Sequence, residues 1–233
     1  MINVSPWDEM LQTYVNLQGR VDYRRWQAES ASWLEDWLAS LSSFDPAALD
    51  RQESLALLLN LYNALTVQQV LKRYPIASIQ PTWLGIPNWI AFWRFFTRSI
   101  YTLNGQQLSL NQIEHGLLRQ QYSEPRIHFA LVCASTGCPL LRNRAYRADQ
   151  IEQQLEEDAQ RFIQNPQKVR YEAAEQTLYC SKIFKWYRQD FLRVAPSVPD
   201  YVQLYLPAAG LSGATTVKYL PYDWSLNQIA SSS

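Results

Sequence analysis

The sequence predicts a single α+β domain that is mostly helical and carries a small β-sheet. Apolar residues recur at helical spacing over most of the N-terminal third and again in two later segments. Only a few short segments have strand character, and two of them flank an Asn-Gly turn. The 233 residues are 47% hydrophobic and contain no internal repeat or linker, so one domain over 1–233 is the simplest organisation.

Two helices are predicted over about residues 5–42, and we expect them to pack on the remainder of the domain. The first runs from Trp7 to about Leu17, with Ser5 as its cap and Pro6 at its first helical position. The second covers 28–41, where large apolar side chains recur at helical spacing: Trp33, Leu34, Trp37 and Leu41.

A long central helix is predicted over about 47–73, ended by Tyr74-Pro75. Its apolar positions run nearly all the way round, which indicates a buried helix. Asn60 and Asn63 lie three residues apart and so share one face of this helix. Each is either a core amide with partners or a functional group, and the sequence leaves both readings open.

The segment 76–93 is predicted to be irregular, because it holds two prolines and several tryptophans, and it suggests the wall or lid of a cleft. A hairpin is predicted next, with Asn104-Gly105 as its turn. Ser109 and Gln112 then form a capping box for a helix over 110–122.

The remaining elements are shorter. An apolar strand is predicted over Ile127–Val132, followed by a polar turn through 133–139. Further along the chain we expect a helix over about 148–164, paired strands near 169–171 and 177–179, a helix over 182–193, and a last strand and turn from Tyr219.

The net charge and the cysteine content limit the possible partners and cellular compartment of the protein. Lys plus Arg and Asp plus Glu each number 21, so the net charge is zero and we expect neither nucleic acid nor a membrane as partner. The N-terminus has no secretory pattern, and no apolar run reaches the length of a membrane span. Three cysteines without a signal peptide indicate free thiols in a reducing compartment, so we expect a cytoplasmic protein without a cofactor.

The residues best suited to nucleophilic and acid–base chemistry gather around the turn after Val132. Cys133 and Cys138 flank it, and the two histidines of the chain, His115 and His128, lie nearby in the sequence. A zinc site is not favoured, because a C-x4-C spacing without a second pair supplies too few ligands. Cys133 is either a nucleophile held near backbone amides or a buried small hydrophobe.

The sequence does not decide which histidine is the base for Cys133. If 127–132 is a straight strand, about 16 Å separate His128 from Cys133, which is too far for a hydrogen bond. His115 escapes that constraint because it lies on the preceding helix. Glu114 points about 100° away from His115 on a regular helix, so it could instead orient the other histidine.

The chain resembles the family of domains of unknown function numbered 547 over about 55–228. The matching segments are NLYNALTV, SLNQIEHGLLR, PRIHFALVCASTGCPLL, the following AY, SKIFKWYRQDF and YLPYDWSLN. Many members carry Gly and a basic residue in the turn after the first cysteine, where this chain has Ala134 and Thr136.

The resemblance implies that six residues fall on family motif positions: Asn63, Glu114, His115, His128, Cys133 and Cys138. It also implies a similarity to permuted papain-like thiol enzymes with a Glu–His–Cys triad, and thiol peptides such as glutathione as ligands.

These observations predict a cysteine-dependent hydrolase or acyl transferase acting on a peptide, an amide or a thiol peptide. Cys133 is the nucleophile, His128 or His115 the base and Glu114 the orienting group; Asn63 and Ser135 are predicted to bind substrate. Amides of Ser135–Gly137 are predicted to hold the oxyanion. The alternative is a non-catalytic peptide or protein binding module with an aromatic groove over 83–96, and a thiol-redox role of Cys133 and Cys138 is a third reading.

Overall fold

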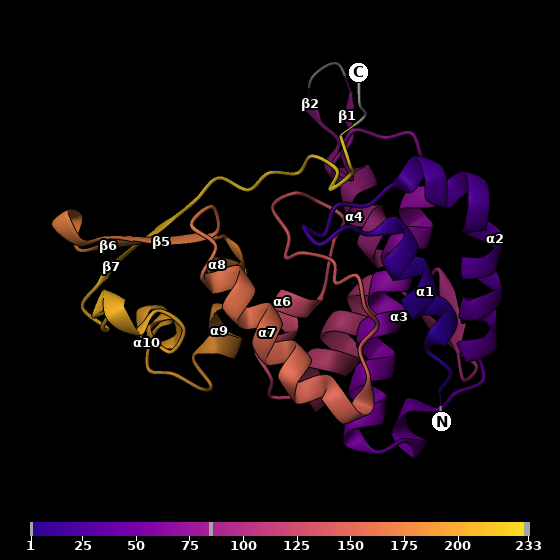
Figure 1. Ribbon diagram of the computed structural model, residues 1–233, viewed down its shortest axis with the longest axis horizontal. Coiled ribbons are helices and arrows are strands. Elements are labelled where there is room, and N and C mark those ends of the chain that lie inside the picture. The colour runs from indigo at the N-terminus through magenta and orange to yellow at the C-terminus, as the bar shows by residue number, and fades with distance from the viewer. Residues whose placement is uncertain (1, 84–85, 231–233) are drawn as a thin grey trace.

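Helix α3, Arg51–Leu71, is the axis around which the N-terminal half of the fold is built (Figure 1). The computed structural model describes residues 2–83 and 86–230. Asp50 caps the helix by accepting from the backbone amides of Gln52 and Glu53. Among the described helices, α3 alone is long and apolar enough to cross a bilayer, and 94% of that apolar stretch is buried inside the fold. The predicted buried central helix is confirmed, although it begins at Arg51 after a short 3-10 turn, Pro46–Ala48.

Helices α1, Ser5–Tyr14, and α2, Tyr23–Leu41, pack beside α3 and form the indigo part of Figure 1. Helix α1 is shorter than predicted, and its cap position is Val4, so Ser5 does not cap it. Helix α2 starts five residues earlier than predicted because Asp22 caps it through the amide of Arg25. Buried rings hold the two helices together: Trp7 stacks on Trp37 at 5.5 Å, and Tyr14 stacks on Trp26 at 5.0 Å.

The segment expected to be irregular contains a hairpin and a helix. Strands β1, Thr82–Trp83, and β2, Ile86–Pro87, pair antiparallel, and helix α4, Trp89–Thr97, follows. Asn88 caps α4 by accepting from the amide of Ala91, a cap signal that the neighbouring prolines obscured. Residues 84–85 of the predicted aromatic groove, and the Trp83 side chain, lie outside the described residues.

The Asn104-Gly105 hairpin is confirmed. Strands β3, Tyr101–Leu103, and β4, Gln106–Leu108, pair antiparallel, and both turn residues have positive φ, 47° and 77°. The capping box is also confirmed, since Ser109 N–H donates to Gln112 at 2.8 Å and Gln112 N–H donates to Ser109 at 3.2 Å. The helix that it starts is a π-helix over Gln112–Leu118, continued by α5, Arg119–Gln121.

The predicted strand over 127–132 is wrong, because Ile127–Ala130 forms a short helix, α6. The amide of Leu131 donates to the carbonyl of Ile127 and closes this helical turn. All four residues of α6 are buried, so this short segment has no exposed face. The alternation of apolar and polar residues that distinguishes a strand from a helix is therefore not available here. Helix α6 joins the two cores of the molecule, because Phe129 packs in the C-terminal cluster and Ile127 in the N-terminal one.

The C-terminal half adds a three-stranded sheet with helices beside it. Strand β6, Thr177–Cys180, pairs antiparallel with β5, Val169–Glu172, and parallel with β7, Thr216–Tyr219, in agreement with the predicted strand pair. The predicted helix over 182–193 is broken into two short helices at Tyr187. The remaining elements are α7, Ile151–Ile163; α8, Ile183–Trp186; α9, Arg188–Phe191; α10, Val198–Gln203; and the 3-10 turns Ala148–Gln150, Ala173–Glu175 and Pro207–Ala209. Mostly helical, with small sheets, the chain has the predicted α+β class.

After β7 the chain runs back toward the N-terminal helices as the extended yellow segment of Figure 1. Residues of this segment form single β-bridges with three distant parts of the chain: Ser78 with Ser225, Ser135 with Leu226, and Val21 with Gln228. The C-terminal segment therefore ties the two halves together at the turn that follows α6.

Candidate functional site

The turn from Leu131 to Leu140 is held from the N-terminal side by Asn63 of α3. The Asn63 amide nitrogen donates to the carbonyl of Ala130 at 3.0 Å, and its oxygen accepts from the amide of Val132 at 2.9 Å. Asn60 makes the equivalent pair with the backbone of Tyr146. Both asparagines are buried, so each is a core amide with backbone partners. The structure thus gives Asn63 the task of placing the chain just before Cys133.

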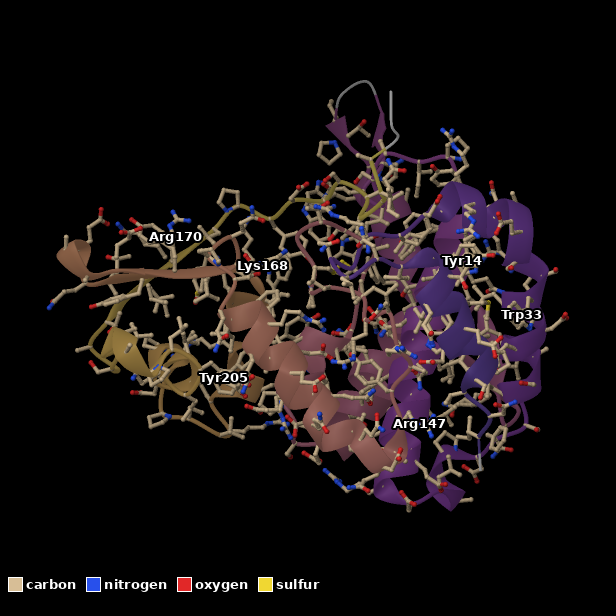
Figure 2. All side chains as sticks on the ribbon, in the orientation of Figure 1. Tyr14, Trp33, Arg147, Lys168, Arg170 and Tyr205 are labelled. Carbon is tan, nitrogen blue, oxygen red and sulfur yellow. A yellow bond between two sulfur atoms is a disulfide. The ribbon has the colours of Figure 1, made fainter. Side chains whose placement is uncertain are left out.

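The same turn is held from the other side by Lys168, which lies just before β5 (Figure 2). Its ammonium group donates to the carbonyls of Thr136 and Cys138 at 2.7 and 2.9 Å. Burial lowers the pKa of Lys168 to about 8, and the charge of Arg20 acts in the same direction. The two hydrogen bonds from Lys168 therefore hold the turn in place, although burial disfavours the charged form of this lysine.

Cys133 and Cys138 are joined in a disulfide, which corrects the expectation of free thiols at this turn. Cys133 is partly exposed, whereas Cys138 is buried. Cys180 is a free, buried thiol on β6, and burial raises its pKa to about 12. Any reagent that reaches this site from solvent therefore meets the sulfur of Cys133 first.

Three donors surround the sulfur atoms. The Tyr222 hydroxyl donates to Cys138 Sγ at 3.2 Å, and the backbone amide of Cys133 donates to the same sulfur at 2.9 Å. The Ser135 hydroxyl lies 3.1 Å from Cys133 Sγ. Burial raises the pKa of Tyr222, the hydrogen bond from Ser135 at 3.3 Å opposes this, and the Glu114 carboxylate acts with burial, so this phenol keeps its proton near neutral pH.

The predicted oxyanion hole of turn amides is not present in the expected form. The amides of Thr136 and Gly137 each donate at 2.7 Å to carbonyls of the C-terminal segment, those of Ser225 and Asp223. These two N–H groups already donate to the C-terminal segment, so they cannot also donate to an oxyanion. The hydroxyls of Tyr222 and Ser135 face the sulfur atoms instead, with Ser135 donating to the Tyr222 oxygen at 3.3 Å.

The backbone of this turn is strained at one residue and crowded at another. Ala134 has φ of 63°, a left-handed conformation that a side chain disfavours. At Gly137 an added Cβ would lie 2.8 Å from the Asp223 carbonyl oxygen and 2.8 Å from the Tyr222 ring, so only glycine fits.

Glu114 lies on the π-helix, is 7% exposed and is surrounded by phenols. Tyr62 of α3 donates to its carboxylate at 3.2 Å. Burial raises the pKa values of Tyr62 and Tyr187, and the Glu114 charge acts in the same direction. The Glu114 charge also acts to raise the pKa of Tyr222, whose hydroxyl donates to Cys138 Sγ.

His115 lies at the edge of the site, with a side chain that is 40% exposed. Its Nε2 lies 3.9 Å from Glu114 Oε1, so the two adjacent side chains come closer than a regular helix predicts. Arg119 donates to Nδ1 at 2.7 Å, and since a guanidinium only donates, Nδ1 is the acceptor. In the neutral ring the proton is therefore on Nε2, facing Glu114.

His128 lies in the core, with a side chain that is 1% exposed. Its Nε2 contacts Asp190 Oδ2 at 2.8 Å, and its ring stacks on Tyr187 at 3.8 Å. Burial lowers the pKa of His128, which favours the neutral ring. Arg119 makes two hydrogen bonds to the same Asp190, at 2.6 and 3.1 Å, so one arginine connects both histidines.

The structure brings some predicted residues together and leaves others apart. Cys133, Cys138 and Ser135 meet at the sulfur atoms, and Glu114 with His115 lies at the neighbouring π-helix. His128 faces Asp190, and within the described residues no hydrogen bond joins either imidazole to a sulfur atom. In the same part of the chain, no group of three or more His, Cys, Asp or Glu side chains is arranged to hold a metal ion.

Sequence reasoning missed five residues of this site: Tyr62, Arg119, Lys168, Asp190 and Tyr222. Four of them lie inside segments that carry the family resemblance: Tyr62 in NLYNALTV, Arg119 in SLNQIEHGLLR, Asp190 in SKIFKWYRQDF and Tyr222 in YLPYDWSLN. Those segments were a usable signal. Lys168 follows no motif, and only the fold shows that it reaches the turn.

Comparison with known proteins supports the family resemblance. A family model described as a protein of unknown function, DUF547, matches residues 46–163, which covers α3, the π-helix, the cysteine turn and α7. No curated protein and no solved structure matches the chain. The likeness to permuted papain-like enzymes stays a prediction.

Proposed function

The chain belongs to the DUF547 family, and we propose that it is a cysteine-dependent hydrolase or acyl transferase with Cys133 as nucleophile. One observation carries the proposal: the partly exposed sulfur of Cys133 lies beside the hydroxyls of Ser135 and Tyr222, on a turn held from both sides. The substrate in this proposal is a peptide, an amide or a thiol peptide such as glutathione, bound through contacts that include Ser135 and the backbone placed by Asn63.

The active form in this proposal is the reduced one. An external thiolate attacks Cys133 Sγ, the sulfur–sulfur bond breaks, and Cys138 leaves as a thiolate. The Cys133 amide and the Tyr222 hydroxyl already donate to Cys138 Sγ and stabilise that charge. A second external thiol then releases Cys133 and leaves as a disulfide with the first. The protein gains two electrons and two protons, and two thiols are oxidised.

His115 is the acid–base group in this proposal, because it is exposed and lies beside Glu114, whereas His128 is buried against Asp190. With its proton on Nε2, His115 can donate to a leaving amine. It can accept the thiol proton once Arg119 releases Nδ1. Glu114 holds the ring by its charge and stabilises the imidazolium that forms. His128 is then a positioning residue for Asp190 and Tyr187.

The chemical step follows from these roles. The Cys133 thiolate adds to the carbonyl carbon, and the carbonyl electrons move to oxygen, where the Tyr222 and Ser135 hydroxyls donate. The tetrahedral adduct then expels the amine, which takes a proton from His115, and a thioester on Cys133 remains. Water, or a second amine or thiol, attacks this thioester and returns the Cys133 thiol.

The test uses an activated nitrophenyl ester as the probe, because the natural acyl group is unidentified. The reduced protein should release nitrophenol in a burst, carry the acyl group on Cys133 by mass spectrometry, and then turn over. Cys133→Ala should abolish the burst, and Cys180→Ala, the matched control in the buried β6 position, should leave it unchanged. A burst that survives in Cys133→Ala refutes Cys133 as nucleophile.

A second candidate function, thiol–disulfide exchange, is favoured by the disulfide with one exposed and one buried sulfur. In that case the two cysteines act as one redox pair, and Cys138→Ser should abolish turnover. For the hydrolase, Cys138→Ser should keep the acylation burst and remove its need for a reductant. The Cys138→Ser variant therefore separates the two functions.

A further inference from the structure

Helix α4 and strand β2 present large apolar side chains to solvent. Ile86, Trp89, Ile90 and Trp93 are 70%, 54%, 75% and 59% exposed. The opposite face of α4 is buried: Phe92 packs edge-on against Trp224 at 4.8 Å. In Figure 1 strands β1 and β2 project from the top of the molecule, with α4 beside their base. A cluster of exposed tryptophan and isoleucine of this kind marks an interaction surface.

This surface is also cationic. The sequence contains no Asp or Glu between Glu53 and Glu114, while Arg73, Arg94 and Arg98 fall in that interval. These three arginines line one hollow of about 410 Å³, together with Asn88, Ile90, Ala91 and Phe95. Within the described residues none of the three arginines forms an ion pair with a carboxylate. Burial lowers the pKa of Arg73, and the positive charge of Arg98 acts in the same direction.

We infer that α4 and the adjoining strand β2 dock on an anionic lipid surface, with phospholipid phosphates bound in the arginine hollow. Trp89, Ile90 and Trp93 lie at spacings of one, three and four residues and so share the outer face of α4, as the apolar residues of interfacial helices do. Tryptophan is favoured at the level of lipid headgroups, and arginine binds phosphate through two parallel hydrogen bonds.

Charge distribution reconciles this inference with the zero net charge of the whole chain. The acidic residues lie before residue 54 and after residue 113 in the sequence, and in the part of the chain that the structure describes none of them forms an ion pair with Arg73, Arg94 or Arg98, whereas Glu35 pairs with Lys72. Arginines at an anionic leaflet attract it over about a Debye length, which makes the docking salt-dependent. An acidic peptide would use the same arginines, but it would leave the protruding Ile86 and the outer tryptophans in water, so the lipid surface accounts for more of the exposed side chains.

The test is flotation of the full chain with vesicles of phosphatidylcholine alone and of phosphatidylcholine with phosphatidylserine. We expect binding to the anionic vesicles, weakened by salt, and little to the neutral ones. Arg94→Gln and Arg98→Gln should each weaken partitioning roughly fivefold, and the Trp89→Ala, Trp93→Ala pair should weaken it on the order of tenfold or more. All four side chains are exposed or line the hollow, so the variants should fold, and circular dichroism checks this.

Two matched controls lie on α2: Trp33, which is 42% exposed and labelled on its outer side in Figure 2, and the exposed Arg24. Trp33→Ala and Arg24→Gln should bind anionic vesicles like the unchanged chain. The inference is overturned if the chain does not float with anionic vesicles, or if the controls lose as much as the α4 variants. Capture of a polyglutamate peptide without vesicle binding also overturns it, and assigns the surface to an acidic protein segment.

Discussion

The hydroxyl of Tyr222 donates to the sulfur of Cys138 at 3.2 Å, across 84 residues of sequence. This contact connects the C-terminal extended segment to the turn after α6. The Tyr222 ring is held in place by Trp224 at 4.4 Å and by Trp186 at 4.8 Å. The phenol is therefore a fixed donor at the disulfide, and its removal has a specific expected effect.

Tyr222→Phe should slow reduction of the Cys133–Cys138 disulfide by a small thiol, roughly threefold to tenfold. The ring stays in place, but the Cys138 thiolate loses a donor worth about 1 kcal/mol. Reduction followed by mass spectrometry measures the rate. Tyr101→Phe is the control, because its hydroxyl donates to the carbonyl of Leu38 on α2 and not to a sulfur atom. Equal rates in both variants would contradict the role of Tyr222.

Asn63→Ala and Asn60→Ala form a matched pair on α3. Each removes two buried hydrogen bonds to the backbone, so each should lower the free energy of unfolding by about 2–5 kcal/mol, measured by urea titration. Only Asn63 holds the chain next to Cys133. We therefore expect Asn63→Ala alone to change the rate at which the reduced Cys133 is alkylated. The same change in Asn60→Ala would indicate a general loss of structure.

Ala134→Gly should raise the free energy of unfolding by about 1 kcal/mol, because glycine adopts the left-handed conformation without strain. Thermal unfolding of the oxidised protein measures it. Gly137→Ala should have the opposite effect, a loss of about 1–3 kcal/mol, since its Cβ collides with the Tyr222 ring and the Asp223 carbonyl. A destabilised Ala134→Gly variant would show that the strain estimate has the wrong sign.

The elements that the sequence predicts well are those with local chemistry. The Asn104-Gly105 turn and the Ser109–Gln112 capping box are set by their own residues, so their geometry follows without the rest of the fold. The 127–132 segment is different, because tertiary burial covers every side chain of Ile127–Ala130 and removes the period that distinguishes strand from helix.

The site shows the same division. Cys133, Cys138 and Ser135 are close in sequence, and their grouping was predictable from the segment itself. Tyr222 lies on the C-terminal segment and Lys168 just before β5, and both contact the turn across a long stretch of sequence. No local pattern predicts these contacts. The separation of the two histidines also depends on long-range packing, because Asp190 of α9 binds His128 in the core.

Stability should fall as pH falls from about 7 to about 5. Burial lowers the pKa of His128 in the fold, so below about pH 6.5 the unfolded chain takes up a proton that the folded chain does not. The slope should approach about 1.4 kcal/mol per pH unit at most. Although burial opposes it, hydrogen bonds from His128 and Arg119 hold the pKa of Asp190 well below its usual range, which extends the loss of stability to pH values below about 4.

His128→Gln should be less stable than the unchanged chain at neutral pH and should lose this slope between about pH 7 and pH 5. His115→Gln is the control, because it removes the other histidine of the chain at an exposed position. Urea titrations at a series of pH values measure both. An unchanged slope in His128→Gln would assign the pH dependence to other groups.

The pH dependence of alkylation at Cys133 in the reduced protein shows whether this thiol is an activated nucleophile. Buried Cys180 should stay unlabelled and serves as the internal reference. We predict that the Cys133 thiolate forms with a pKa well below the ordinary value of about 8.5, and that this low pKa is lost in His115→Ala and kept in His128→Ala. A Cys133 that reacts with an ordinary thiol profile in all three proteins would contradict this prediction, and would leave the disulfide as a structural link.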